Sequence, residues 1–501
     1  MHLSGARIPW LAALIAALLL PFLLVDVPPV LDYPNHLARF FVLAHPDDPI
    51  LSRFYAPHWG VVPNLGFDVI GMLLLKFLPV HIGGRLLLGL SLLAPVMGVL
   101  AYSRAAFGRI TGWALASSLA AFNGVFFLGF MNFLLALGLA LAAAGLWLHL
   151  RRRGWAKAVA AGALSSALLF FCHIFGVLLF ALLVSCAELE RLWQERKTLT
   201  VSEFLRAAAM LALALAPAMI LYALSPLSGT MAGADEWAEF SHKAWEVFTP
   251  FMTPVKAVTL LTGLCVFGFL IMHLRAARFA PGARLALLLL ALVFAFAPDT
   301  LKGGTFLDVR LSLMFGMLLF AGIAPAPQGG RFWGWLLIAL LVLRSGVVAL
   351  AWYDHRQDLA DLRAAIAFVP PGAKVMAAEG EAPERLVMPG LYRLDSHFAA
   401  LLLIERHAFW PLLFADPAQQ PLMVLPPYDD IAEPSLSEPV EWILLAQPIT
   451  PEAAALTDYL QNWRRNFDFV LLVEPPAFGP VPAGLTLVHA GGIAALYRIT
   501  R

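Results

Sequence analysis

Charged residues are scarce in this chain. Asp, Glu, Lys and Arg make up 13% of its 501 residues, whereas 60% are hydrophobic and the mean hydropathy is +0.78. Because soluble domains are about one quarter charged, this composition excludes a water-soluble fold of such length. The net charge is only +1, so the chain also lacks the strongly basic surface that nucleic-acid binding requires. We therefore expect membrane lipids, and no nucleic acid, among its partners.

Cysteine is equally scarce. The three cysteines, Cys172, Cys186 and Cys265, all lie inside apolar stretches, and none forms a CxxC pair. This spacing excludes a disulfide framework and a cysteine metal site. We expect the three thiols to be small, inert side chains in a packed interior.

Long hydrophobic runs, in contrast, are abundant. A membrane-spanning helix needs about 20 mostly apolar residues, and such runs occur at 9–26, 83–103, 111–130, 131–150, 204–224, 255–273, 283–298, 308–325 and 332–352. The first run ends at Asp26 without a small-x-small cleavage site, so we interpret it as an uncleaved span and not as a signal peptide.

Two further segments depart from this simple pattern. The run 156–187 is too long for one span and is interrupted at Cys172-His173, so we interpret it as two spans that meet near His173. The weaker segment Phe67 to Leu78 contains Asp68 and Lys76. It is either re-entrant or an extension of the next helix. The total is about eleven spans.

The connections between the runs differ in charge. If the N-terminus is cytoplasmic, the loops on that side hold the cations Arg104, Arg109, Arg151, Arg152, Arg153, Arg191, Arg196, Lys197, Arg275, Arg278 and Arg331. The loops on the other side hold Asp26, Asp32, Asp47, Asp48, Asp235, Glu236, Glu239 and Asp299. This is the positive-inside asymmetry of membrane proteins. It predicts a cytoplasmic N-terminus, a first outside loop over 26–67, and a position outside the cytoplasm for everything after Tyr353.

The composition changes after Tyr353, where apolar runs shorten and proline and charge become more frequent. Helical spacing occurs at 358–368 and 451–466, and strand-like runs occur at 374–378, 442–446, 467–473, 485–489 and 493–499. Helices that alternate with buried strands are typical of an α/β domain. The sequence therefore predicts a polytopic α-helical membrane domain over 1–353, followed by an extracytoplasmic α/β domain over 354–501.

The most distinctive motif reads LDYPNHLARFF and occupies residues 31–41, just after the first span. Pro34 suits the first position of a helix. That helix would have one apolar face, formed by Leu37, Phe40, Phe41 and Ala44, with three polar residues off it, namely Asn35, His36 and Arg39. We expect an amphipathic helix on the outer membrane surface with Asp32 at its N-terminal end. Alternatively, Asp32 only stabilises the positive end of the helix.

An acidic residue past the first span, juxtamembrane helices, many further spans and an outside α/β domain together resemble the GT-C glycosyltransferases. These are membrane enzymes that use polyprenyl-phosphate-linked sugars. The stretch 78–109 looks like the family's second-span region, and 305–311 looks like a late span that opens with an arginine. The stretches 467–472 and 495–498 look like the family's C-terminal domains. The resemblance covers nearly the whole chain and implies a GT-C-like fold.

The resemblance also implies roles for single residues. Asp32 matches the family's first-loop acid, the general base that takes the proton of the acceptor hydroxyl. The leaving group is a polyprenyl phosphate, whose growing negative charge requires fixed cations. Arg310 is the first candidate, Lys302 the second and Arg39 the third. Alternatively, Lys302 is a solvated loop residue, and Arg310 snorkels or pairs with Asp308.

One departure from the family pattern concerns metal binding. Many members carry a second carboxylate near the outer start of the fourth span, sometimes as a metal ligand, but here Asn132 occupies that place. A neutral amide is a poor ligand for a hard divalent cation. Although Asp47 or Asp48 could substitute, the sequence predicts no metal and no other cofactor.

Five polar residues are candidates for lining a cavity, namely Asn35, His36, Asp48, Asn132 and His173. Each has a structural alternative: His173 and Asn132 as hydrogen-bonded packing residues between helices, and Asp48 as a helix cap. The polar residues of the C-terminal domain, such as His397 and Glu405, match no catalytic motif. We expect them to lie on a solvated surface.

The sequence thus predicts a glycosyltransferase of the bacterial inner membrane. It would transfer a sugar from a polyprenyl-phosphate-linked donor to a glycan or glycolipid acceptor on the periplasmic side. One alternative is a lipid-glycan transporter or flippase, which predicts two related halves with discontinuous helices; only the interruption at Cys172-His173 favours it. Another is a non-catalytic assembly protein with the same fold, which Asn132 favours.

Overall fold

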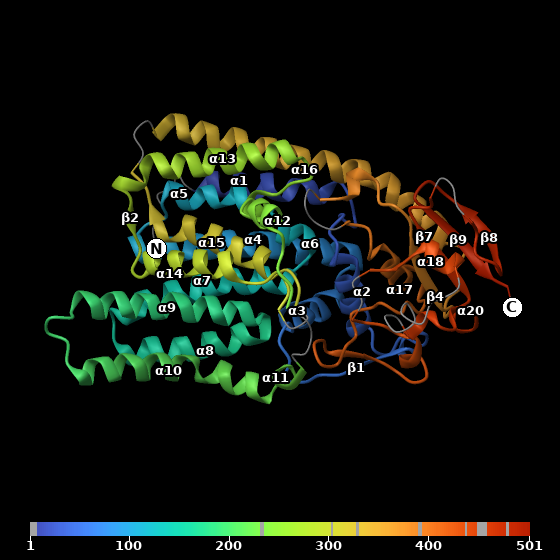
Figure 1. The fold of residues 1–501 in the computed structure, drawn as a ribbon, viewed down its shortest axis with the longest axis horizontal. Helices are drawn as coiled ribbons and strands as arrows, with labels where there is room; N and C mark the ends of the chain where they lie inside the picture. The colour runs from blue at the N-terminus through green and yellow to red at the C-terminus, as the bar shows by residue number, and fades with distance from the viewer. Residues whose placement is uncertain are drawn as a thin grey trace.

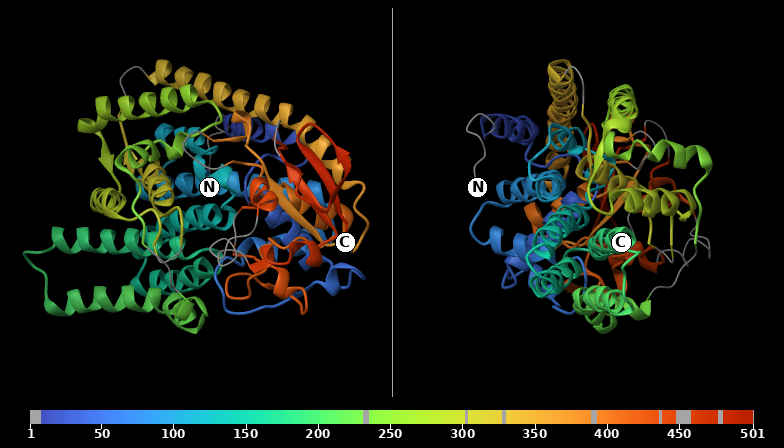
Figure 2. Two further views of the ribbon diagram at one scale, coloured as in Figure 1. Left: turned by 45° about the vertical axis from the view of Figure 1, so that its right-hand side comes forward. Right: turned by 90° about the vertical axis from the view of Figure 1, so that its left-hand side faces the viewer.

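The computed structural model describes residues 8–230, 235–301, 304–326, 330–388, 393–435, 438–447, 458–476 and 480–500. A bundle of long helices forms one part of the molecule, and a region of short helices and strands is attached to one end of it (Figure 1). Two further views show the same arrangement, with the hairpins formed by α8, α9 and α10 projecting away from the C-terminal region (Figure 2).

The bundle contains helices at the predicted apolar runs. Its main helices are α1 (Ile8–Leu19), α3 (Gly66–Leu75), α4 (Val80–Phe107), α7 (Met131–Arg151), α8 (Trp155–Cys172), α9 (Ile174–Gln194), α10 (Val201–Leu224), α13 (Lys256–His273), α14 (Ala283–Phe296), α15 (Leu307–Gly322) and α16 (Gly330–Ile366). Within the described ranges, six of them are long and apolar enough to cross a membrane: α4, α7, α8, α10, α13 and α16. The predicted polytopic helical fold is thus confirmed.

The run 156–187 divides as predicted, and the cause is local. His173 has an extended backbone, and its Nδ1 accepts a hydrogen bond of 3.2 Å from the amide of Phe175, so the imidazole caps the start of α9. The run 111–130, predicted as a single span, is not one regular helix. This run forms α5 (Gly112–Leu115), a 3₁₀ turn η3 (Ala116–Ala120) and α6 (Gly124–Leu128), because Asn123 starts a new helix by accepting from the amide of Phe126 at 2.9 Å.

Close packing in the bundle depends on small residues. At Gly98 of α4, an added Cβ would lie 2.3 Å from the carbonyl oxygen of Gly138 in α7, so these two helices touch backbone to backbone. Small residues allow such close approach where lipid supplies no hydrophobic driving force between helices.

The two ends of the bundle differ in charge. The loops that join α7 to α8 and α9 to α10 lie at the end remote from the C-terminal region (Figure 1) and hold Arg152, Arg153, Arg196 and Lys197. Near this end, the buried carboxylate of Glu188 accepts hydrogen bonds from Arg151 at 2.9 Å and from Arg191 at 3.0 Å. The acidic connections, such as that of Asp299, lie at the opposite end.

The C-terminal region contains a five-stranded sheet in the order β6 (Val440–Glu441), β4 (Val375–Glu379), β7 (Phe469–Val473), β9 (Ala494–Ile499) and β8 (Leu485–Ala490). Strand β4 is parallel to β6 and β7, whereas β9 is antiparallel to β7 and β8. Four predicted strands are therefore present. The fifth prediction is wrong, because 442–446 forms helix α18 (Trp442–Ala446). Of the predicted helix 451–466, residues 451–457 lie outside the described ranges, and α20 (Trp463–Asn466) forms its end.

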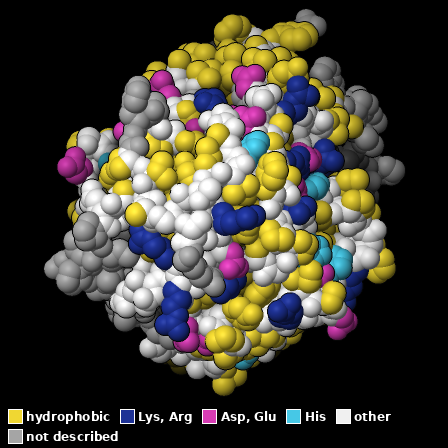
Figure 3. Space-filling model, turned by 90° about the vertical axis from the view of Figure 1, so that its right-hand side faces the viewer, with side chains coloured by type: hydrophobic (Ala, Val, Ile, Leu, Met, Phe, Trp, Pro, Cys, Tyr) yellow, Lys and Arg dark blue, Asp and Glu magenta, His cyan; other side chains and the backbone are white. Residues whose placement is uncertain are grey.

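The change of composition at Asp354 is not a break in the backbone. Helix α16 continues through it to Ile366 and packs against the sheet, so one helix carries the chain from the bundle into the C-terminal region. The outer face of that region shows basic, acidic and histidine side chains scattered among hydrophobic ones (Figure 3).

Helix α2 (Tyr33–Ala44) lacks the exposed polar side of an amphipathic surface helix, so the expectation of an amphipathic helix is wrong. Asn35 and Arg39 on its polar side are buried like the apolar residues, because α2 is enclosed between α3 and the C-terminal helix α17 (Leu401–Arg406). The first outside loop also contributes β1 (Tyr55–Pro57), which pairs antiparallel with β5 (Leu422–Val424). The first loop and the C-terminal region are therefore packed together.

The described ranges also contain further short elements. They are η1 (Leu20–Leu23), η2 (Leu51–Arg53), α11 (Leu227–Thr230), α12 (Phe240–Glu246), η4 (Thr249–Phe251), η5 (Leu274–Ala276), β2 (Arg278–Phe279), β3 (Ile323–Ala324), η6 (Glu384–Leu386), η7 (Phe398–Ala400), η8 (Asp429–Ile431) and η9 (Asp458–Leu460). Strands β2 and β3 pair antiparallel.

Candidate functional site

Asp32 lies where the first loop meets α6. The amides of Leu31 and Asp32 donate to the carbonyl oxygens of Phe127 and Leu128, at 2.9 and 3.2 Å. Gly129 lies directly against Asp32 with a φ of +85°, and a Cβ on Gly129 would be 2.8 Å from the Cβ of Asp32. The Asp32 side chain keeps 14% of its surface exposed and makes no cap hydrogen bond to α2. The backbone therefore fixes Asp32 while its carboxylate stays accessible.

A histidine from the C-terminal region faces this carboxylate. Nδ1 of His397 is 3.3 Å from Oδ1 of Asp32, and the His397 side chain is fully buried. Its ring is in edge-on contact with Trp410 and Phe414, at centroid distances of 6.0 and 5.1 Å. The expectation that His397 is a solvated surface residue is wrong. Sequence reasoning had no signal for it, because His397 meets Asp32 only through the packing of the two parts of the chain.

Arg310 lies in the first turn of α15, at the same end of the bundle. Its guanidinium donates to the carbonyl oxygens of Thr305 and Phe306. It lies over the ring of Phe130, 4.4 Å from the centroid, and 5.7 Å from that of Phe175. Its Nε is buried and has no hydrogen-bond partner among the described residues. Arg310 thus presents a cation that aromatic rings hold in place.

Asp32 and Arg310 lie on either side of one dipeptide. Gly129 touches Asp32, and Phe130 stacks on Arg310. The carboxylate of Asp32 acts electrostatically on the Arg310 guanidinium. The structure therefore brings the candidate base and the first candidate cation together, although one follows the first span and the other opens a late helix.

His173 is close to Arg310. Its ring contacts Phe133 and Phe175 at centroid distances of 5.6 and 5.5 Å, and it interacts electrostatically with Arg310. Because Nδ1 accepts the hydrogen bond from the amide of Phe175, the proton of a neutral His173 must be on Nε2. His173 is thus both a helix cap and a possible donor beside the cation.

Arg39 has a different partner. Its guanidinium donates to both carboxylate oxygens of Asp68 in α3, at 2.6 and 3.2 Å, and the two side chains are 1% and 0% exposed. An arginine that is neutralised in this way holds α2 against α3. We therefore leave Arg39 out of the phosphate-binding set. Lys302 lies outside the described residues.

Two of the other candidates, Asn35 and Asn132, bind backbone groups through their side-chain amides. Asn35 donates to the carbonyl of Leu412 at 2.9 Å and accepts from the amide of Phe414 at 2.8 Å. Asn132 accepts from the amide of Phe67 at 2.9 Å and donates to the carbonyl of Asn64 at 2.7 Å. Both amides thus join segments that are distant in the sequence, and neither is free for a ligand.

Asp48 acts at the start of η2. It accepts from the amides of Ile50 and Leu51 at 3.0 and 2.8 Å, and lies 2.9 Å from Nδ1 of His407. His36 is buried, and its ring stacks on Phe40. Burial, together with the nearby cation of Arg39 and the side chain of His397, holds the pKa of His36 well below its usual range. His36 is therefore neutral at physiological pH.

No protein-family model matches the chain, and no curated protein does either. Among solved structures, it is similar to the crystal structure of ArnT from Cupriavidus metallidurans bound to undecaprenyl phosphate. The likeness covers 99% of this chain and 98% of that one, with a TM-score of 0.51 and 11% identity. ArnT is a GT-C glycosyltransferase. The chain has a GT-C-like membrane fold.

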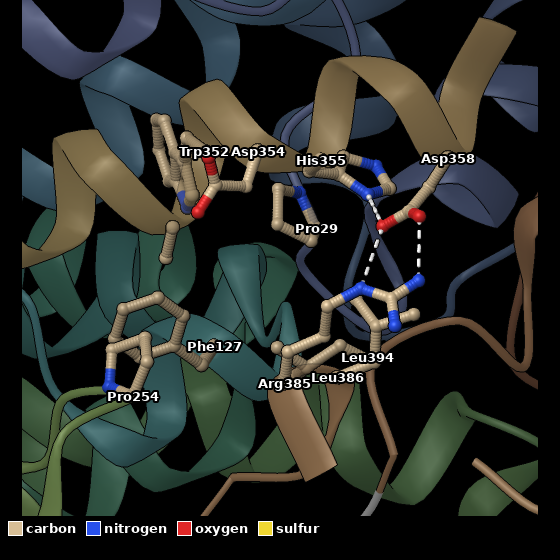
Figure 4. Close-up of a pocket in the computed structure, with 11 residues that line it drawn as sticks. Pro29, Phe127, Pro254, Trp352, Asp354, His355, Asp358, Arg385, Leu386 and Leu394 are labelled. Carbon is tan, nitrogen blue, oxygen red and sulfur yellow. Dashed lines mark hydrogen bonds and ion pairs between the residues drawn. The ribbon is translucent and has the colours of Figure 1, made fainter. Parts of the chain in front are cut away.

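Two cavities lie in the described part of this GT-C-like fold, and neither Asp32 nor Arg310 lines them. The first is lined by Trp352, His355 and Asp358 of α16 and by Arg385 (Figure 4). There Asp358 lies between His355, at 3.3 Å, and Arg385, at 2.6 Å. The cavity holds about 50 Å³, which is room for one or two water molecules. It is therefore too small for a sugar.

The second cavity of the GT-C-like fold is apolar and measures about 210 Å³. It lies among α13, α14, α15 and the turn at η4, and its lining includes Phe251, Phe267, Phe294, Ser312, Phe315 and Gly316. Ser312 and Phe315 follow Arg310 on α15, so this cavity lies along the helix that carries Arg310 in its first turn. Its walls suit a hydrocarbon chain.

Proposed function

We propose that the protein is a glycosyltransferase that uses a polyprenyl-phosphate-linked sugar. The observation that carries this proposal is the placement of Asp32 and Arg310 on the two sides of Gly129-Phe130. An accessible carboxylate next to a held cation provides a base and a phosphate-binding group in one place. The GT-C-like fold and the solved complex of ArnT with undecaprenyl phosphate support the choice of lipid.

In the proposed reaction, the Asp32 carboxylate accepts the proton of the acceptor hydroxyl. The oxygen then forms a bond to the anomeric carbon, while the bond from that carbon to the phosphate oxygen breaks. The electron pair of the broken bond stays on the phosphate oxygen, and Arg310 stabilises the negative charge of the phosphate. His397, 3.3 Å from Asp32, orients the carboxylate, and Nε2 of His173 provides a second donor for the phosphate.

The isoprenoid chain would enter from the bilayer and occupy the apolar cavity among α13, α14 and α15. This position leaves the phosphate at the outer end of α15, where Arg310 is located. The acceptor would approach from the C-terminal region, which contributes His397 to the site.

The charge distribution supports an orientation for this chemistry. The basic loops lie at the end of the bundle remote from the C-terminal region, and basic loops remain in the cytoplasm. The C-terminal region and the site would therefore face the periplasm of a bacterial inner membrane. The acceptor would be a glycan or glycolipid on that side.

The test is sugar transfer by the purified protein in detergent or nanodiscs. Polyprenyl-phosphate donors with a radiolabelled sugar are supplied with membrane glycolipid extracts, and the release of polyprenyl phosphate and the labelled product are measured. We expect Asp32→Asn to reduce turnover by at least about 10²-fold, the usual contribution of a general base. Asp47→Asn is the matched control, because Asp47 is an exposed carboxylate in the same loop.

Two results would contradict the proposal. One is an Asp32→Asn protein that folds and transfers sugar at the wild-type rate. The other is movement of the lipid-linked sugar across vesicle membranes by a wild-type protein that never cleaves the donor, which would establish the transporter alternative.

A further inference from the structure

Three carboxyl groups meet at the outer end of the bundle, beside the proposed site. Glu246 is the last residue of α12, Asp299 follows α14, and Asp308 lies in the first turn of α15. One carboxylate oxygen from each residue lies within 4.8 Å of the other two. Glu246 is 1% exposed and Asp308 is fully buried. Three segments distant in the sequence therefore aim carboxylates at one point.

Several of these oxygens lack hydrogen-bond partners. Both carboxylate oxygens of Glu246 and Oδ2 of Asp308 are buried without a hydrogen bond from any described residue. Removing an ionised carboxylate from water costs several kcal/mol unless another charge compensates it. The cluster therefore requires protons on its carboxyl groups or a cation among them.

The neighbouring basic side chains do not occupy the centre of the cluster. Nδ1 of His242 lies 3.2 Å from Oε1 of Glu246, but this histidine is 43% exposed and approaches from outside. The ammonium of Lys243 donates to the carbonyl of Ala297. Arg310 donates to the carbonyls of Thr305 and Phe306. The hydrogen bonds of Lys243 and Arg310 therefore go to backbone carbonyls outside the cluster.

We propose that Glu246, Asp299 and Asp308 bind a hard divalent cation. Carboxylate oxygens are the ligands that calcium, magnesium and manganese prefer. Two oxygens on opposite sides of a calcium ion are about 4.6–5.2 Å apart, twice the ligand distance of about 2.3–2.6 Å, so oxygens within 4.8 Å of one another fit around such an ion. Magnesium requires a smaller separation of about 4.2 Å. Water molecules would complete the coordination.

The bound ion would join α12 to the start of α15. The hydroxyl of Ser312 already donates to the backbone carbonyl of Glu246 at 2.7 Å, and the ion adds a second link one turn earlier. Asp308 precedes Arg310 by two residues, so the ion would also fix the turn that carries this arginine. The prediction of no metal was based on Asn132, which occupies the place of the family's second carboxylate. The cluster of Glu246, Asp299 and Asp308 lies in other segments of the chain.

The test is direct metal binding by the chelator-treated, purified full-length protein. Calcium binding is measured by calorimetry, manganese binding by electron paramagnetic resonance, and thermal unfolding is followed with added CaCl₂, MgCl₂ or MnCl₂. We expect about one ion per chain and a higher Tm with at least one of the three salts. We expect Asp308→Asn and Glu246→Gln each to weaken binding at least tenfold. Glu239→Gln, at an exposed carboxylate before α12, should bind like the wild type.

Two outcomes overturn the proposal. One is a wild-type protein that binds none of the three ions and whose Tm does not change. The other is Asp308→Asn or Glu246→Gln protein that binds with wild-type affinity. If a variant does not fold, the wild-type measurements still decide the matter. None of these measurements uses sugar transfer. Absence of metal binding would therefore leave the proposed glycosyltransferase function intact, and absence of sugar transfer would leave the proposed metal site intact.

Discussion

Oδ1 of Asp32 lies 3.3 Å from Nδ1 of His397, which joins the first outside loop to the C-terminal region at the proposed base. The contact is buried on the histidine side and accessible on the carboxylate side. A histidine in this position can hold the carboxylate in one orientation without itself touching the substrate. Each of the following predictions tests one such relationship.

His397→Gln should lower kcat about tenfold and leave the KM for the donor unchanged, because the carboxylate loses its neighbour while the phosphate-binding groups remain. The pH profile of kcat should also change, which a purely structural loss would not cause. The measurements are steady-state kinetics of donor cleavage between pH 5.5 and 8.5. His58→Gln, at an exposed histidine of the first outside loop, is the control. An unaltered kcat and pH profile for His397→Gln would remove this positioning role.

Arg310→Gln should weaken the binding of polyprenyl phosphate by about 10- to 100-fold, since a charge-assisted contact is worth about 1.5–3 kcal/mol. Arg310→Lys should recover part of the affinity, because it retains the charge but not the planar group that lies over Phe130. Binding is measured with purified protein and undecaprenyl phosphate in nanodiscs. Arg53→Gln, an exposed arginine in the first outside loop, should bind normally. Equal affinities for the Gln variants at both positions would exclude Arg310 from the phosphate site.

Gly129→Ala should reduce both stability and turnover. Residue 129 has a φ of +85°, and the new Cβ would meet Asp32 at 2.8 Å. The backbone conformation alone costs about 1–2 kcal/mol for a residue with a Cβ, and the clash would displace Asp32. Thermal unfolding and donor cleavage are measured together. Gly112→Ala is the matched control, because nothing lies within 4 Å of a Cβ there; a Gly129→Ala protein with the same properties as this control would contradict the prediction.

Asp68→Asn should destabilise the protein by about 3–5 kcal/mol, because it leaves the buried Arg39 charge without its partner. The double variant Arg39→Met with Asp68→Leu should recover most of this loss, since both charges disappear together. The unfolding midpoint in detergent is measured for Asp68→Asn, for Arg39→Met and Asp68→Leu as single variants, and for the double variant. Additive losses in the double variant would show that the two residues are not coupled.

The C-terminal region should lose stability as the pH rises from about 5 to 8. Burial raises the pKa of Glu379 to about 8 and that of Glu474 to about 7, despite the opposing effect of nearby arginines. Both carboxyls have a higher pKa in the folded than in the unfolded protein, so folding is favoured while they are protonated. This stability is fully present below the unfolded pKa and is lost as the pH rises through the folded values.

Glu379→Gln should therefore flatten the pH dependence of unfolding and raise the Tm at pH 8. Thermal unfolding between pH 5 and 8.5 tests this expectation. Glu441→Gln, at an exposed carboxylate on the neighbouring strand β6, should retain the wild-type profile. A Glu379→Gln protein with the wild-type slope would refute this assignment.

Much of the fold could be predicted from the sequence because it depends on local properties. The spans follow from apolar runs of sufficient length, and β4, β7, β8 and β9 follow from short apolar runs between turns. The division of the run 156–187 at His173 was also visible. One error occurred where a side chain bonds to a nearby backbone amide, because Asn123 starts a helix inside an apparent span. The other is at 442–446, which forms a helix despite its strand-like composition and without a side-chain cap.

The candidate site was less predictable. Asp32 and Arg310 were chosen from a resemblance in sequence, and in the structure they lie on the two sides of the dipeptide Gly129-Phe130. Arg39 and Asn132 were also plausible site residues by their chemistry. In the structure, however, Arg39 is bound to Asp68, and Asn132 is bound to the backbone of residues 64 and 67. Their partners lie on other helices, so no local pattern identified them.

The sequence by itself determined which segments form long apolar helices, which connections are basic and where four of the five strands of the C-terminal sheet lie, because hydropathy, charge and periodicity are properties of neighbouring residues. Only the tertiary structure decided which polar groups meet: Asp32 with His397, Arg39 with Asp68, and the three carboxyls around Asp308. These meetings depend on how helices and loops distant along the chain pack together. Burial then strengthens the electrostatic interactions within each group, because charges interact more strongly in the protein interior than in water.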